Sequence, residues 1–327
     1  MNYQDQYTRQ VADGIWMVST PLGTVSVHVY LVDTGDGFLL YDAGLKCTAS
    51  LVLTALQNIC GDYKKLHTLV ISHSHHDHIG AVAEIAERTG ARVFAHALAE
   101  PWMVDHQRQF QEFFGTFSRW LEIPETLQTF FFENLGRPWC ADSWLRQFPV
   151  QLEGPRRIEL HSTPGHSADG LSLLLPDEGV VLCGDAFMGA GVGGSLPQYE
   201  NRRQYLQSLE TLMEWRPRIL LTGHFEPLWD AAIEQALDQS KSLVHILHEF
   251  IQQTIHKLGR ECNTGDLTRL VCARFGRHLV PQAFITVLAH LHDLERDGLV
   301  YQEGENWKPG QKPRPLFQII GVNQISN

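Results

Sequence analysis

Hydrophobic residues in the first third of the chain occur in short runs between turn residues, a pattern typical of β-strands. Val, Ile, Leu and Tyr dominate these runs, and Gly-containing turns separate several of them. The pattern predicts strands over residues 14–20, 25–33, 37–41, 67–71 and 91–95. Residues 47–59 and 79–86 instead carry apolar residues at helical spacing. Strands and helices therefore alternate, which predicts a mixed α/β (α+β) fold.

Residues 97–150 lack strand patterns and are rich in aromatic side chains, among them Phe113 and Phe131. We predict a helical insert here. One interpretation is that its aromatic residues only pack on the main core. The other is that they form a lid lined with apolar surface over a ligand site, and the two are compatible.

The last third of the chain changes character. Helical patterns cover residues 230–257, 264–275 and 281–296, with Pro281 at the start of the last of these helices. Two short strands then predict a hairpin over residues 297–307. We therefore predict two domains, which are residues 1–237 and residues 238–327.

The composition indicates a globular protein. Of the 327 residues, 43% are hydrophobic and only 19% are charged, which excludes a disordered chain. The net charge of −11 argues against a general binder of nucleic acid or anionic membrane, and basic and acidic residues balance over 241–310. The polar N-terminus, the absence of a long apolar run and the unpaired cysteine spacing predict a cytoplasmic protein.

A cluster of metal-ligand residue types occupies residues 73–78, which read H-S-H-H-D-H. The cluster follows a predicted strand and precedes a predicted helix, where α/β proteins build ligand sites. His73 and His75 point to the same side of an extended backbone, so both can reach one metal ion. Asp77 and His78 lie on the turn into the helix and can face a second position. His76 points away, and we interpret it as a non-ligand.

Four further residues of the same types follow predicted strands or lie on turns, as a metal site at one edge of a sheet requires. These are Asp42, His166, Asp185 and His224. Taken alone, each is more typical of a turn, a cap or a surface position. Other histidines such as His28 show no such spacing and are interpreted as ordinary core or surface residues.

In this order, the motifs resemble those of the metallo-β-lactamase-fold hydrolase superfamily, over about residues 14–230. The resemblance implies a four-layer αβ/βα sandwich. It implies that one metal is held by His73, His75 and His166. A second metal would be held by Asp77, His78 and His224. Asp185 would bridge the metals, and Asp42 would orient a ligand. The chain departs from many relatives after His224, because Phe225 and Glu226 precede Pro227.

The resemblance also implies a chemistry. Two divalent ions, zinc with iron or manganese as alternatives, would share a bridging hydroxide, and Asp77 would guide the released proton. We expect hydrolysis of a thioester, ester or lactone, and the aromatic block favours a small-molecule substrate with an apolar acyl group. Asp77 and Asp42 are the expected catalytic residues.

Two alternatives stay open. One is a metal-dependent phosphodiesterase or endoribonuclease, because the C-terminal helices and hairpin resemble a winged helix, which follows the hydrolase domain in some endoribonuclease-like members. The other is a non-catalytic, metal-bearing regulatory or binding protein. The charge balance disfavours nucleic acid as a partner. We expect the C-terminal module to close the substrate pocket or to pack a homodimer, and we expect no membrane partner.

Overall fold

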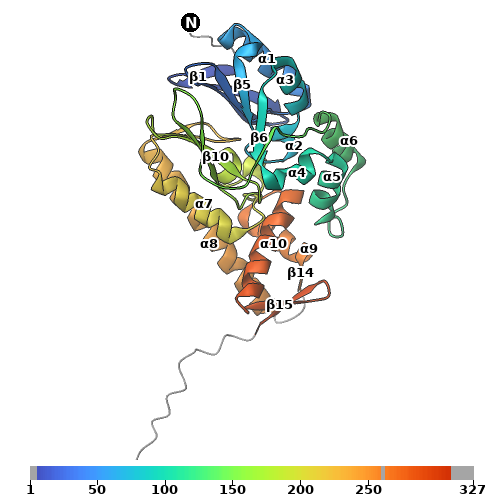
Figure 1. Cartoon of the computed structure of the whole chain (residues 1–327). Helices are drawn as coiled ribbons and strands as arrows, with labels where there is room; N and C mark the ends of the chain where they lie inside the picture. Colours follow the sequence, from blue (N-terminus) through green and yellow to red (C-terminus); the bar gives the residue numbers. More distant parts are fainter. Residues whose placement is uncertain (1–5, 259–261, 311–327) are drawn as a thin grey trace, which may run out of the picture.

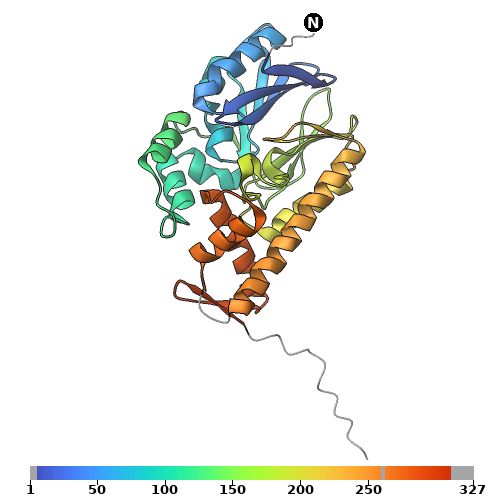
Figure 2. The same cartoon turned by 180° about the vertical axis from the view of Figure 1, so that it is seen from behind.

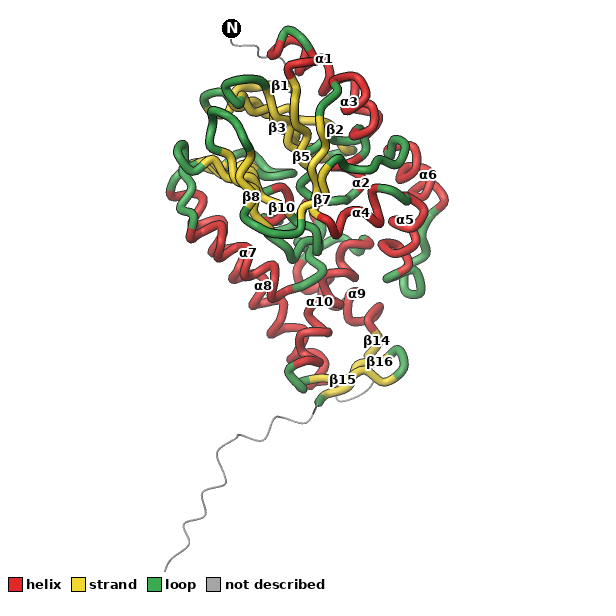
Figure 3. Tube along the Cα trace, in the orientation of Figure 1, coloured by secondary structure: helices red, strands yellow, loops and turns green. Residues whose placement is uncertain are grey.

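A computed structural model describes residues 6–258 and 262–310, and two large β-sheets lie face to face at its centre (Figure 1, Figure 3). Helices cover the outer face of each sheet, so the main body has the layer order helix, sheet, sheet, helix. A small third sheet lies at the far end of the C-terminal helices (Figure 1). The predicted four-layer α/β fold is confirmed.

The first sheet has seven strands in the order of the chain. They are β1 (Thr8–Ala12), β2 (Ile15–Leu22), β3 (Val25–Asp33), β4 (Phe38–Tyr41), β5 (Leu66–Val70), β6 (Arg92–His96) and β7 (Ser143–Leu145). Strands β1 to β4 pair antiparallel, whereas β4 to β7 pair parallel. The carboxyl ends of β4 and β5 therefore meet at one edge, which brings Asp42 next to residues 72–78.

The second sheet has six strands in the order β13-β12-β11-β10-β9-β8. They are β8 (Val150–Leu152), β9 (Ile158–Ser162), β10 (Leu171–Leu175), β11 (Val180–Leu182), β12 (Ile219–Leu221) and β13 (Leu228–Trp229). Only β11 and β12 pair parallel among these described strands. Their carboxyl ends lie side by side, so Asp185 and His224, which follow them, reach the same edge.

Side-chain alternation explains how one strand serves two layers. In β3, Val29 and Leu31 pack in the core beneath α1 (Ala49–Cys60) and α3 (Val82–Thr89). Tyr30 and Val32 point the other way, into the core between the sheets. In the second sheet, Val181 packs against α7 (Arg202–Glu214) and α8 (Ala231–Leu258), the long helix that crosses the view in Figure 2.

The predicted strands of the first third are present as β2 to β6, and the helix predicted over 47–59 is α1. The helix predicted over 79–86 is divided at Gly80 and Ala81 into α2 (His76–Ile79) and α3. The sequence patterns missed β1, because its residues Thr8–Ala12 are polar and half-buried at the sheet edge. An edge strand has one partner and carries a weak hydrophobic signal.

The aromatic insert contains α4 (Glu100–Met103), α5 (His106–Gly115) and α6 (Glu125–Asn134). Its rings pack on one another, with Phe114 4.7 Å from Phe110 and 5.5 Å from Phe131 between ring centroids. We expected no strand within residues 97–150. This is wrong for the last residues of that range, because β7 pairs with β6 and β8 begins at Val150. Three-residue strands are too short to show alternation.

The C-terminal part contains the end of α8, β14 (Cys262–Asn263), α9 (Thr264–Phe275), α10 (Pro281–Arg296), β15 (Val300–Glu303) and β16 (Asn306–Pro309). The predicted helices and hairpin are therefore present. Trp307 is fully buried where the hairpin packs on the helices. The predicted boundary at residue 237 falls inside α8, and the two-domain division and the winged-helix resemblance stay predictions. Among the described helices, none is long and apolar enough to cross a membrane.

Candidate metal centre

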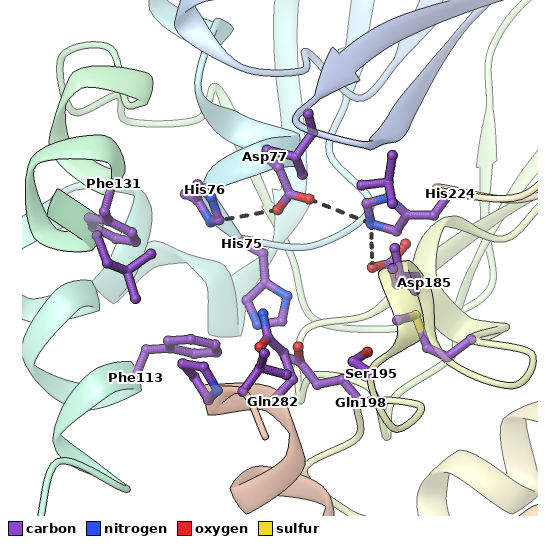
Figure 4. A pocket seen from close by; sticks show the side chains of 18 of the residues that line it. His75, His76, Asp77, Phe113, Phe131, Asp185, Ser195, Gln198, His224 and Gln282 are labelled. Carbon is purple, nitrogen blue, oxygen red and sulfur yellow. Dashed lines mark ion pairs between the residues drawn. The ribbon is translucent and has the colours of Figure 1, made fainter. Parts of the chain in front are cut away.

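The predicted ligand residues converge at the edge where strands of both sheets end. Figure 4 shows His75, Asp77, Asp185 and His224 of this set around the cavity. His73 and His75 follow β5, and Asp77 and His78 lie in α2. His166 follows β9 on a turn. Asp185 and His224 follow β11 and β12. Each is buried or half-buried, and neighbouring ligand atoms lie within 4.8 Å of one another.

The first group consists of His73, His75 and His166. The Nε2 atoms of His73 and His166 each lie 2.9 Å from Nδ1 of His75. Nδ1 of His166 donates a hydrogen bond to the Gln198 carbonyl at 2.9 Å. Nε2 of the neutral ring therefore carries a lone pair that can bind a metal. Burial lowers the pKa of all three imidazoles, so the neutral form that a metal requires is favoured.

The second group consists of Asp77, His78 and His224. Asp77 Oδ2 lies 3.8 Å from His78 Nε2 and 3.5 Å from His224 Nε2. His224 donates from Nδ1 to the Ser26 carbonyl at 2.9 Å, so its Nε2 lone pair also faces the centre. Backbone carbonyls accept hydrogen bonds from His166 and His224 and so fix the orientation of both rings. Metal-binding histidines in proteins usually have such a hydrogen-bond acceptor on their second ring nitrogen.

Asp185 lies between the groups. Its Oδ2 is 3.4 Å from His166 Nε2 and 3.2 Å from His224 Nε2, so it faces one member of each set. The same oxygen lies 3.9 Å from His73 and 3.7 Å from His78. A carboxylate in this position can be shared by two cations.

Asp42 touches no open part of the site but fixes its loop. Its Oδ2 accepts from His78 Nδ1 and from Ser72 Oγ, both at 2.8 Å, and its Oδ1 accepts from the Ser72 amide at 2.7 Å. Ser72 Oγ in turn lies 2.9 Å from His73 Nδ1. Asp42 has a positive φ of 66°, a conformation that a non-glycine residue keeps only when surrounding contacts hold it.

Carboxylates give the second group an affinity for positive charge. Burial alone would lower the pKa of His224, yet Asp185 and Asp77 raise it to about 9. Burial also opposes ionisation of Asp77, but His78, His76 and His224 lower the pKa of its carboxyl to about 2. The same balance raises the pKa of His78 well above its usual value, through Asp42 first. Protons and cations therefore compete for these side chains.

Two observations show that these residues fit a pair of cations. His78 Nε2 and Asp185 Oδ1 are buried and have no hydrogen-bond partner among the described residues, which is costly unless a cation binds them. Gly223 leaves the space that Asp185 occupies, because a Cβ on Gly223 would lie 2.1 Å from Asp185 Oδ1. Imidazole and carboxylate are ligands for zinc, iron and manganese.

His76 belongs to neither ligand group, in line with its interpretation as a non-ligand, but its ring stays at the site. It packs 5.3 Å from the Phe131 ring and lines the cavity beside Asp77 (Figure 4). Phe225 packs on Phe187, and Glu226 forms an ion pair with Arg9. Neither Phe225 nor Glu226 is among the described residues that line the cavity.

Sequence reasoning missed several partners of the centre. Asp169 accepts from the Ser74 amide at 2.8 Å and holds the loop of residues 73–78. The carbonyl groups of Gln198 and Ser26 orient two of the histidines. Backbone carbonyls leave no mark in a sequence. Asp169 carried a weak signal, since it is a carboxylate three residues after His166 on the same turn.

A cavity of about 460 Å³ opens from the metal-ligand residues. One wall comes from α5 and α6 of the insert, through Phe113, Phe114, Phe130 and Phe131. The opposite side comes from residues 22–25, from residues 188–198 and from the start of α10, which contributes Pro281 and Gln282. The cavity therefore joins the metal centre to apolar surface from the insert and to the C-terminal helices.

The segment 194–199 forms part of that wall and is tied to the C-terminal helices. The Pro197 carbonyl accepts from Thr286 Oγ1 at 2.9 Å, and Tyr199 hydrogen-bonds His290 Nε2 at 2.7 Å. Leu196 is buried in the core of α8, α9 and α10. Because Gln198 in this segment holds His166, the C-terminal helices support the first ligand group.

Comparison with known proteins agrees with the fold. Residues 22–224 match the family model of the metallo-beta-lactamase superfamily, and the chain belongs to this superfamily. Membership implies a metal-dependent hydrolase. The chain is 24% identical over 280 residues to the "Beta-lactamase-like protein 2 homolog" of Drosophila melanogaster, covering 83% of this chain and 82% of that protein.

Two further comparisons extend beyond the family region. The chain is 24% identical to the "Atrochrysone carboxyl ACP thioesterase" of Aspergillus fumigatus, covering 87% of this chain and 80% of that protein. A metallo-beta-lactamase family protein from Thermus thermophilus superposes with a TM-score of 0.75 at 22% identity, covering 92% of this chain and all of that one. The structural likeness therefore includes the C-terminal part as well as the sandwich.

Proposed function

We propose that this protein hydrolyses a thioester, ester or lactone with an apolar acyl group, using two divalent metal ions, with zinc as the first candidate. The observation that carries the proposal is that one cavity has the ligand groups at one end and the insert's phenylalanines along its wall. A reactive carbonyl at the polar end and an acyl chain along the rings would occupy both regions at once.

Ions bound by the two groups would act as Lewis acids and lower the pKa of water to about 7. The chain's own residues prepare the rest. Asp77 remains a carboxylate at neutral pH, because neighbouring histidines lower its pKa to about 2. Asp77 lines the cavity, and its Oδ2 lies 3.5 Å from His224 Nε2. This carboxylate would accept the proton of the attacking water.

The cavity walls favour an acyl substrate over a phosphodiester. None of the described residues that line the cavity is Lys or Arg, whereas a polyanion needs such side chains to neutralise its charge. The lining combines phenylalanines and aliphatic residues with amides and a few hydroxyl groups. The thioesterase named among the relatives supports the thioester as the first substrate class to test.

The test is a hydrolysis assay on metal-analysed protein with acyl thioesters, a lactone and an aryl ester of matched chain length, and with single-stranded RNA. We expect acyl cleavage that grows with chain length and disappears in Asp185→Ala. The matched control is Asp177→Ala, which removes an exposed turn carboxylate and should leave activity intact. Metal-loaded protein that cleaves RNA but no acyl substrate would overturn the proposal.

A further inference from the structure

Two buried glutamines, Gln109 and Gln198, belong to the residues that line the cavity, and each has one amide atom that no described residue satisfies. Gln109 on α5 is 1% exposed, and its Oε1 is buried without a partner. Gln198 is 6% exposed, and its Nε2 is likewise buried without a partner. Buried amide groups are normally hydrogen-bonded, so an unmatched pair in one pocket points to a ligand that completes them.

Both side chains flank the first ligand group. Gln109 Nε2 donates to the carbonyl of Ser74, the residue before His75, at 2.5 Å. Gln198 accepts from His166 through its carbonyl, and His75 and His166 hold their facing nitrogens 2.9 Å apart. Figure 4 shows Gln198 on the wall across from Asp77, near Ser195 and Gln282. Gln109 therefore contacts the residue before His75, and Gln198 contacts His166, so both glutamines lie next to the first ligand group.

The chemistry of the missing partner follows from the atoms. The bond from Gln109 to the Ser74 carbonyl fixes its amide orientation, so Gln109 presents an acceptor. Gln198 presents a donor. A carboxylate would oppose the acceptor, and a ketone or ether would satisfy only the donor. A hydroxyl group has both functions on a single oxygen, whereas a secondary amide has its N–H and C=O on separate atoms and can bond two different side chains.

We propose, on the basis of the proposed function, that the substrate contains a secondary amide close to the scissile carbonyl, and that Gln109 and Gln198 recognise it. The amide N–H donates to Gln109 Oε1, and its carbonyl accepts from Gln198 Nε2. The amide belongs either to the leaving thiol or to the acyl group, and these two sources are separated by the test.

The test uses three thioesters of similar length. S-octanoyl-N-acetylcysteamine has the amide in the thiol half, the S-pentyl thioester of N-hexanoylglycine has it in the acyl half, and S-pentyl octanethioate has none. We expect wild-type kcat/KM for one of the amide substrates to exceed that for the plain substrate by about tenfold or more. Whichever amide substrate is preferred identifies the half that carries the amide.

Gln198→Met keeps the backbone carbonyl that holds His166 and removes the donor. The ratio of kcat/KM between amide and plain substrates should then fall to about two, and Gln198→Glu should lower it as well, since an acceptor replaces the donor. Gln204→Met, the same change at an exposed position on α7, should leave the ratio unchanged. Equal wild-type rates on all three substrates, or an unchanged ratio in both Gln198 variants, would overturn the inference.

A binding measurement separates this inference from the proposed function. Calorimetry with non-hydrolysable thioethers, with and without the amide in each half, should show the same preference of about tenfold in wild type and its loss in Gln198→Met. Amide-dependent binding, together with no cleavage of any thioester, ester or lactone, would retain the amide site and refute the proposed function. Thioester cleavage with no amide preference in rate or binding would retain the proposed function and refute the amide site.

Discussion

The two ends of the central cavity are built by different kinds of interaction. At the metal end, each histidine of the second group has a hydrogen bond behind it, such as the bond from His78 to Asp42. Along the wall formed by the insert, which we call the aromatic end, Phe113 and Phe114 contact each other at 5.1 Å between centroids and are held by packing alone. Hydrogen bonds fix atoms within narrow limits of distance and angle, whereas apolar packing tolerates changes of similar volume.

This difference predicts where substitutions act. Changes at the metal end should alter metal affinity and leave substrate preference intact. Changes at the aromatic end should alter substrate preference and leave metal content intact. The following variants test that separation, from the largest expected effect to the smallest.

Gly223→Ala should have the largest effect, because the new Cβ would lie 2.1 Å from Asp185 Oδ1 and displace the shared carboxylate. We expect metal affinity to fall by about a hundredfold or more, since ligand position is lost as well as orientation. Metal content after dialysis and competition with a chelator measure this. Gly115→Ala is the control, because a Cβ there meets nothing within 4 Å; a similar loss in that variant would contradict the explanation.

Asp42→Asn should lower metal affinity by roughly 10- to 100-fold, the usual range for a partner behind a metal ligand. Asparagine tolerates the positive φ of residue 42, so the backbone should remain in place. The change removes the charge that pairs with His78. Chelator competition gives the affinity, and circular dichroism checks the fold. Unchanged affinity would show that Asp42 only supports the loop.

His290→Gln tests the link between the C-terminal helices and the cavity wall through pH. Burial, and then His248, Arg202 and His245, hold the pKa of His290 well below 6.5. The folded chain therefore excludes a proton that the unfolded chain binds below about pH 6.5, so His290 reduces stability as the pH falls. Between pH 7 and pH 5 this loss should be about 2 kcal/mol.

The measurement is urea unfolding of wild type and variant at pH 7 and pH 5. His290→Gln should show a smaller loss of stability at pH 5, because the side chain no longer titrates while its amide can still bond Tyr199. His292→Gln, which replaces an exposed histidine on the same helix, should keep the wild-type loss. Identical pH dependence in both variants would refute the assignment to His290.

Phe113→Leu should have the smallest effect and should act at the aromatic end, which borders the first ligand group at His75. Its ring lies 5.4 Å from the His75 ring and lines the cavity. We expect unchanged metal content and a change of about tenfold in the kcat/KM ratio between long and short acyl substrates. A loss of metal instead would show that the two ends of the cavity are coupled.

The sequence predicted the metal end better than the aromatic end. His73, His75, Asp77 and His78 follow a strongly apolar strand at a spacing that few other structures require, so their convergence was predictable. The position of Phe113 beside His75 was not, because it depends on how α4 to α6 fold back over the sheet. Only tertiary packing decides which of many similar aromatic residues reaches the cavity.

The fold shows the same limit. Long strands with clear patterns, such as β3, were found at their true bounds. Short or polar strands such as β1 and β7 were missed, since their stability comes from their neighbours rather than from their own residues. Gln109 and Gln198 had no signal in the sequence, because glutamine occurs most often on surfaces and burial is a property of the fold.

The tie between Thr286 and Pro197 has a consequence for anyone who shortens or recombines this chain. A fragment that ends before α10 would leave the Pro197 carbonyl and the Tyr199 hydroxyl without their partners on that helix. Residues 194–199, whose Gln198 carbonyl orients His166, would then lose their contacts with α10. Chimeras with related sandwiches should therefore exchange residues 194–199 and α10 together, as one matched pair of surfaces.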